Sequence, residues 1–155
     1  AKVIAKTRKK YNMSTEQNKE LVRRFYEEAI NQGKLSLMDE LFTPDYQHHD
    51  PAFPPEWQHG GLAVYKQVNE TFISTFVPFH VEVKDLFAEG DRVVSRWTFS
   101  GKQEKDFQGI PPTHKHIEVE NIVIHRIANG KIVEAWFSYD ALGLLQQLGA
   151  VPSAR

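Results

Sequence analysis

The chain has 155 residues, of which 41% are hydrophobic and 25% charged, and its formal net charge is −1. This composition is typical of one globular domain with a real hydrophobic core, and it excludes an intrinsically disordered chain. The sequence contains no cysteine, which excludes disulfides, thiolate metal sites and a cysteine nucleophile. No apolar run reaches the 18 residues that indicate a membrane-spanning helix, so we expect a cytoplasmic protein without a membrane partner.

The charge is distributed unevenly along the chain. Residues 1–12 hold five basic residues and no acidic one, whereas the remainder carries 14 basic and 20 acidic residues. We expect residues 1–13 to form a flexible basic leader, or sequence upstream of a start at Met13, and residues 14–155 to form a single domain. One short basic segment is a weak electrostatic footprint, so no nucleic-acid partner is expected.

Hydrophobic residues recur at helical spacing in the first half of the chain. The pattern predicts a helix that begins near Ser14 and ends at residues 31–33, a short helix over 35–42, and a third helix that carries Val64 to Phe76. The proline-rich segment 45–61 is interpreted as a loop with one short strand.

The second half changes to the alternating period of strands. The predicted strands cover residues 79–84, 92–100, 116–127 and 132–139, and a short helix over 141–148 follows. Asn129-Gly130 is a strong hairpin signal between the last two strands. Helices followed by a long antiparallel sheet predict an α+β fold, in which a curved sheet wraps around the N-terminal helices as a cone with an internal pocket.

Asp140 is the first candidate for acid–base chemistry. It follows the last predicted strand, directly after an aromatic stretch that ends at Tyr139. A carboxylate among aromatic side chains loses solvation, which would raise its pKa toward the range useful for giving and taking a proton. An Asp at the start of a helix is also a common N-cap, and the two roles do not exclude each other.

The register of the last hairpin decides which strand residues would join Asp140. A two-residue turn would place three side chains on its face of the sheet: Asn121, His125 and Trp136. A wider turn with a bulge at Gly130 would instead turn two carboxylates inward: Glu118 and Glu120. A slip of one residue exchanges the faces, so both registers stay open.

Other candidates lie where the helices meet the sheet. Tyr46, His48 and Asp50 are expected near the mouth of the cone, and His48 is the histidine best placed for proton transfer. Two aromatic residues complete the candidate binding wall: Trp57, as a lid over the mouth or simply as part of the proline-rich loop, and Tyr65, on the third helix. Arg96 and Trp97 are neighbours on opposite strand faces, and Arg96 is expected to pair with a glutamate of the next strand. The histidine pairs lack a third ligand at a suitable spacing, so neither a metal nor a cofactor is expected.

Four motifs carry a family resemblance: HHDP at 48–51, GIPPT at 109–113, GKIVEAW at 130–136 and LLQQLG at 144–149. With these motifs the chain resembles the SnoaL-like polyketide cyclases from Ser14 to about Pro152. That family shares the cystatin-like cone with ketosteroid isomerase, limonene epoxide hydrolase, scytalone dehydratase and nuclear transport factor two. The resemblance implies a cofactor-free cyclase with Asp140 as acid/base, and with His125 and Trp136 as the nearest matches to a strand histidine and a tryptophan.

Together, these observations predict a homodimeric enzyme, paired through the outer sheet face, that binds a hydrophobic, oxygenated small molecule. Asp140 would shuttle a proton next to a carbonyl, with His48 or His125 as the second proton-handling group. One alternative is an epoxide hydrolase-like enzyme, in which an Asp-activated water attacks and Arg96 belongs to the relay. Another alternative is a binding or assembly module without catalysis, in which Asp140 only caps its helix.

Overall fold

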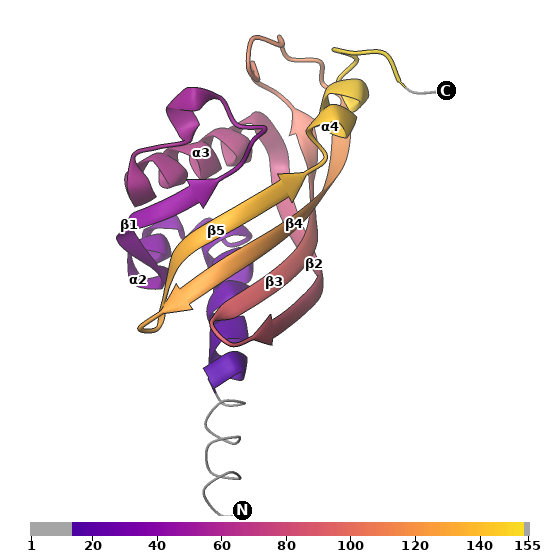
Figure 1. Cartoon of the computed structure of the whole chain (residues 1–155). Coiled ribbons are helices and arrows are strands. Elements are labelled where there is room, and N and C mark those ends of the chain that lie inside the picture. The colour runs from indigo at the N-terminus through magenta and orange to yellow at the C-terminus, as the bar shows by residue number, and fades with distance from the viewer. Residues whose placement is uncertain (1–13, 154–155) are drawn as a thin grey trace, which may run out of the picture.

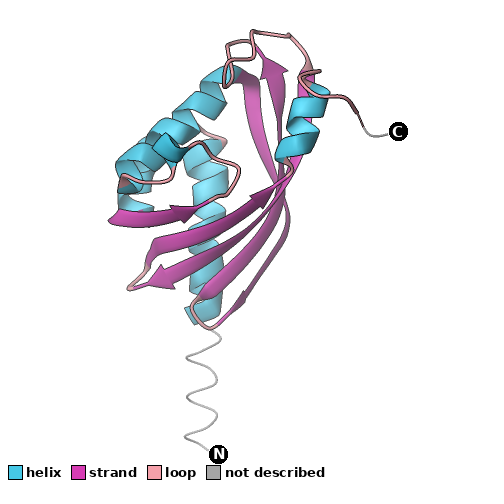
Figure 2. Ribbon diagram, turned by 45° about the horizontal axis from the view of Figure 1, so that its top comes forward, coloured by secondary structure: helices cyan, strands magenta, loops and turns pink. Residues whose placement is uncertain are grey.

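The computed structural model describes residues 14–153, so the predicted leader lies outside the described residues. Helices cover one face of a curved five-stranded sheet (Figures 1 and 2). The helical segments are residues 14–24, η1 (Phe25–Ile30), η2 (Leu35–Leu37), α2 (Met38–Leu41), η3 (Pro55–Trp57), α3 (Gly61–Thr75) and α4 (Ala141–Gln147). The strands are β1 (Phe42–His49), β2 (Phe76–Glu89), β3 (Arg92–Gln103), β4 (His116–Ala128) and β5 (Lys131–Tyr139). The predicted α+β class is confirmed.

The sheet has the order β1-β5-β4-β3-β2. Strands β2 to β5 follow one another as antiparallel neighbours, whereas β1 pairs in parallel with β5 at one edge. The four strands predicted in the second half are all present. β1 is longer than the short strand expected from segment 45–61, because β pairing with β5 overrides the local proline signal.

The inner sheet face and the helices share one hydrophobic core. Side chains of β4 alternate strictly between buried and exposed, as a strand with one covered face requires. α3 turns a buried stripe toward the sheet, with Tyr65, Val68 and Phe72 among its members. The alternation therefore fixes which residues of each strand can reach the interior.

The last hairpin adopts neither of the two predicted registers along its whole length. Next to the Asn129-Gly130 turn, Ile127 pairs with Ile132, as a two-residue turn requires. A bulge then shifts the pairing by one residue, so that His125 lies opposite Ala135 and Asn121 lies opposite Tyr139. The extra residue lies beyond the turn, where nothing in the turn sequence could indicate it.

Two side-chain amides dock helices onto the sheet. The Asn31 amide, just after η1, donates to the carbonyl of Val81 and accepts from its N–H, both at 2.8 Å. Gln147 at the end of α4 does the same for Glu118, at 2.9 and 2.8 Å. Both amides satisfy backbone groups of strand residues that otherwise lack a neighbouring strand on that side.

Within residues 14–153, no helix is long and apolar enough to cross a membrane. The same part of the chain contains no cluster of three or more histidine, aspartate or glutamate side chains arranged to hold a metal ion. The cytoplasmic location stays a prediction.

Candidate active site

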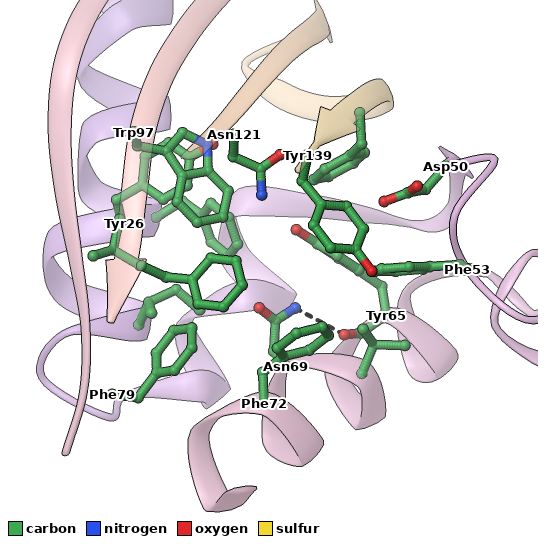
Figure 3. Close-up of a pocket in the computed structure, with 16 residues that line it drawn as sticks. Tyr26, Asp50, Phe53, Tyr65, Asn69, Phe72, Phe79, Trp97, Asn121 and Tyr139 are labelled. Atoms are coloured by element: carbon green, nitrogen blue, oxygen red, sulfur yellow. Dashed lines mark hydrogen bonds between the residues drawn. The ribbon is translucent and has the colours of Figure 1, made fainter. Parts of the chain in front are cut away.

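A cavity lies between the helices and the inner face of the sheet (Figure 3). The free space inside it amounts to about 50 Å³. Most of the lining side chains are aromatic, and they come from η1, α3, the loop after β1, and strands β2 to β5. The wall is therefore suited to a flat, apolar molecule that a few polar groups orient.

Asp50 supplies the carboxyl group of this cavity. The residue follows β1 directly and is only 2% exposed. Its Oδ1 accepts a hydrogen bond from the Ala52 N–H at 2.9 Å, whereas Oδ2 is buried without a partner. Burial raises the pKa of Asp50 to about 6, and the hydrogen bond from Ala52 opposes that rise. In Figure 3 the carboxyl group points toward Tyr139.

The loop after β1 is folded so that Asp50 stays inside. The Gln58 amide donates to the carbonyl oxygens of Asp50 and Phe53, and the Phe53 N–H donates to the Asp50 carbonyl. Phe53 lies against the Trp57 ring and itself lines the cavity. Segment 50–58 thus closes one side of the site with aromatic rings and aims a carboxylate inward.

Two asparagines provide the neutral polar groups of the cavity. Asn121 on β4 is 5% exposed, and its Oδ1 has no hydrogen-bond partner. Asn69 comes from the opposite wall, where its Nδ2 donates to the Tyr65 carbonyl at 2.8 Å (Figure 3). Asp50, Asn69 and Asn121 therefore reach the same space from a loop, a helix and a strand.

His48 lies behind the cavity wall. Its ring packs against those of Phe53, Tyr65 and Phe137 at centroid distances of 4.8, 4.9 and 4.5 Å. Both ring nitrogens are buried without a partner, and burial lowers the pKa of His48 to about 4. The imidazole is therefore neutral at neutral pH, and it borders a separate, more open groove along β1.

His125 belongs to a buried polar cluster beneath the cavity. Its Nε2 lies 3.1 Å from Tyr26 Oη and 3.3 Å from Ser95 Oγ, and these two hydroxyls lie 2.9 Å apart. Burial lowers the pKa of His125 to about 3, which keeps it neutral. Of this cluster, only Tyr26 also lines the cavity, so His125 reaches it through the Tyr26 hydroxyl.

Asp140 lies outside the cavity, which corrects the predicted surroundings of this residue. Its side chain is exposed and accepts the Gly143 N–H at 2.9 Å as the N-cap of α4. The physical reason is the register: residue 139 faces the cavity, so the chain turns outward at residue 140. A catalytic role of Asp140 stays a prediction that its position does not support.

Four further candidates lie on the outer sheet face, again because of the register. They are Arg96, Glu118, Glu120 and Trp136. Arg96 pairs with Glu120 at 3.4 Å, as expected, and with Asp85 at 2.6 Å. The Arg92 guanidinium lies over the Trp136 ring at 4.7 Å. Arg96 therefore cannot serve a relay inside the cavity, which removes the basis of the epoxide hydrolase alternative.

The remaining candidates divide between the cavity and the adjoining groove. Tyr65 and Trp97 line the cavity, as does Asn121. Tyr46 and Trp57 line the groove along β1, which also reaches Tyr65. Tyr46 is almost fully buried, and Trp57 packs against cavity residues rather than covering an open mouth.

The sequence interpretation missed Asn69 and left Asp50 without a role. A signal existed for each. Asn69 is a polar residue on the apolar stripe of α3, between Tyr65 and Phe72. Asp50 follows a strand whose buried positions include Tyr46 and His48, so its own side chain continues the inward alternation.

The fold and the site define a class: an α+β cone in which helices and the inner sheet face line an aromatic cavity with one buried carboxyl group. The sequence profile of the SnoaL-like polyketide cyclases matches residues 20–148, so the chain belongs to this family. It is 29% identical to nogalonic acid methyl ester cyclase of Streptomyces nogalater over 122 residues, which cover 78% of this chain and 90% of the relative.

Two solved structures support the assignment. TsrD from Streptomyces laurentii is 32% identical, with a TM-score of 0.77 over 88% of this chain and 97% of that one. IdmH from Streptomyces antibioticus is 30% identical, with a TM-score of 0.71 over 86% of this chain and 99% of that one. The predicted family is therefore confirmed.

Proposed function

We propose that this protein is a cofactor-independent enzyme that transfers a proton at a carbon next to a carbonyl group. The substrate is a hydrophobic, oxygenated small molecule, and the reaction is of the cyclase or isomerase type. The observation that carries the proposal is Asp50, a buried carboxyl with one unpartnered oxygen and a pKa raised to about 6 inside an aromatic cavity. A relative that acts as a cyclase supports the same reaction class.

The proton transfer follows from the state of this carboxyl group. Near pH 7 Asp50 is mostly ionised, yet it is a stronger base than an exposed aspartate because burial destabilises its charge. It takes a proton from the carbon next to the substrate carbonyl and becomes a carboxylic acid, while the substrate becomes an enolate. The enolate carbon then attacks a second carbonyl, and Asp50 returns the proton to the new alkoxide. An isomerisation would return it to another carbon.

The proposal is tested by hydrogen exchange of a model ketone, 2-tetralone, in deuterated buffer. The wild-type protein is expected to accelerate the loss of the proton NMR signal at the carbon between the ring and the carbonyl. Asp50→Asn is expected to slow this exchange by about 100-fold or more, the usual loss for one positioned base. Asp140→Asn is the matched control and is expected to keep the wild-type rate, because Asp140 lies outside the cavity.

The pH dependence of the exchange rate provides a second test of the proposal. Because the ionised form of Asp50 is the base, the exchange rate should rise between pH 5 and pH 7 with a midpoint of about 6. A loss of exchange in Asp140→Asn but not in Asp50→Asn would contradict the proposal. A wild-type protein that binds 2-tetralone without accelerating exchange would favour the non-catalytic binding module.

A further inference from the structure

Asn69 is half-buried and lies beside the buried stripe of α3. It lies on the cavity side of α3, four residues after Tyr65 and three before Phe72, both of which line the same cavity. Asparagine is a poorer helix former than leucine, and its amide needs hydrogen-bond partners when it is covered. At this position the asparagine brings a polar group to a largely apolar wall of the cavity.

The polarity of the Asn69 amide is fixed by its surroundings. Its nitrogen donates to the Tyr65 carbonyl at 2.8 Å, and a carbonyl can only accept, so the amide cannot turn over without losing this bond. The oxygen then points into the cavity (Figure 3). Among residues 14–153, no side chain or backbone N–H donates to that oxygen. The group is a preset hydrogen-bond acceptor.

A second amide faces the same space from the sheet. Asn121 is 5% exposed, and its Oδ1 is buried without a partner. The hydroxyls of Tyr65 and Tyr139 and the unpartnered Nε1 of Trp97 belong to residues that line the same space. A molecule that fills this space meets an acceptor at Asn69 and a second polar group at Asn121.

We infer that Asn69 determines specificity by accepting a hydrogen bond from a hydroxyl group of the substrate. The substrate must therefore carry a hydroxyl group that reaches Asn69 when the rest of the molecule occupies the cavity. This inference rests on the proposed use of the cavity as the substrate site. It does not require Asp50 to act as a base.

Two probes that differ only in the hydroxyl test the inference: 2-naphthol and 2-methoxynaphthalene. Their dissociation constants are measured from the fluorescence anisotropy of each probe. The wild-type protein is expected to bind 2-naphthol about tenfold more tightly, the value of one good neutral hydrogen bond. Asn69→Leu, in which a better helix former replaces Asn, is expected to fold and to bind both probes equally.

Two control variants separate this role from others. Phe79→Leu removes an aromatic residue of the cavity wall. It is expected to weaken the binding of both probes while leaving the ratio of their dissociation constants unchanged. Asp140→Asn, which lies outside the cavity, is expected to leave both dissociation constants unchanged. A ratio that persists in Asn69→Leu would overturn the inference, as would a wild-type protein that does not distinguish the probes. Because binding is measured without turnover, these outcomes are separate from the exchange test of Asp50.

Discussion

Burial shifts the pKa values of two residues at this site in opposite directions. Burial raises the pKa of Asp50 to about 6 and lowers the pKa of His48 to about 4. In both cases the folded chain favours the uncharged form. The two groups therefore affect stability over nearly the same pH range, about 4 to 6.5, but in opposite directions: the contribution of Asp50 falls as the pH rises, and that of His48 falls as the pH drops.

His48→Phe is expected to reduce the acid sensitivity of the fold. Neutral His48 contributes stability above its ordinary pKa of 6.5, and this contribution is lost as the pH falls toward 4. Phenylalanine suits the aromatic surroundings and removes no hydrogen bond, because neither ring nitrogen has a partner. Between pH 8 and pH 5 the variant should lose about 2 kcal/mol less unfolding free energy than the wild type.

The measurement is urea unfolding at several pH values. His59→Phe is the control, because His59 is exposed in the loop before α3. It should keep the wild-type pH dependence. An unchanged pH dependence in His48→Phe would show that His48 is not buried in the way described.

At the scale of elements, the helices are held on the sheet by a few polar contacts besides apolar packing. Asn31 replaces a missing strand neighbour of Val81 on β2, and Gln147 does so for Glu118 on β4. The first pair of bonds is partly buried, whereas the second is exposed. We therefore expect the partly buried bonds of Asn31 to contribute more to the free energy of unfolding than the exposed bonds of Gln147.

Asn31→Ala is expected to lower the free energy of unfolding by about 2 kcal/mol, because two partly buried bonds are lost and Val81 keeps unsatisfied groups. Gln147→Ala, the matched change on α4, should cost less than about 1 kcal/mol, since water replaces its bonds. Urea unfolding of both variants provides the comparison. Equal losses would contradict the role assigned to burial.

Most elements could be predicted from the sequence, because apolar periodicity and turn residues are local signals. The site depended on one nonlocal feature, the bulge opposite Arg126 in the last hairpin. That bulge turns Trp136 outward and leaves Asp140 to cap α4, whereas Glu120 points outward because β4 alternates without interruption. The carboxyl in the cavity comes instead from Asp50, whose inward position depends on pairing between β1 and β5.

At the scale of the whole molecule, the outer sheet face exposes apolar side chains near its centre. Ile122 is 45% exposed and Ile124 is 39% exposed, with Glu120 and Arg126 on either side along β4. A two-fold axis at residue 123 would place Ile122 against Ile124 of a second copy, and Glu120 against Arg126. The face is thus self-complementary in charge, which supports the predicted homodimer.

If the predicted homodimer forms, Ile122→Lys is expected to prevent it, because the change would place two like charges at the centre of the paired faces. Leu142→Lys, on α4 and 60% exposed, is the control and should leave the dimer intact. Sedimentation velocity measures both. A monomeric wild-type protein, or a dimer that survives Ile122→Lys, would contradict the pairing.

The protonation of one buried carboxyl group, that of Asp50, is central to the proposed activity and can be observed directly. Carbon-13 NMR of protein labelled at the aspartate carboxyls gives the titration of Asp50, assigned as the signal that Asp50→Asn removes. The structure predicts a midpoint of about 6 for this signal. A midpoint near 4, as for an exposed aspartate, would show that Asp50 is solvated and would contradict its role as the base of the cavity.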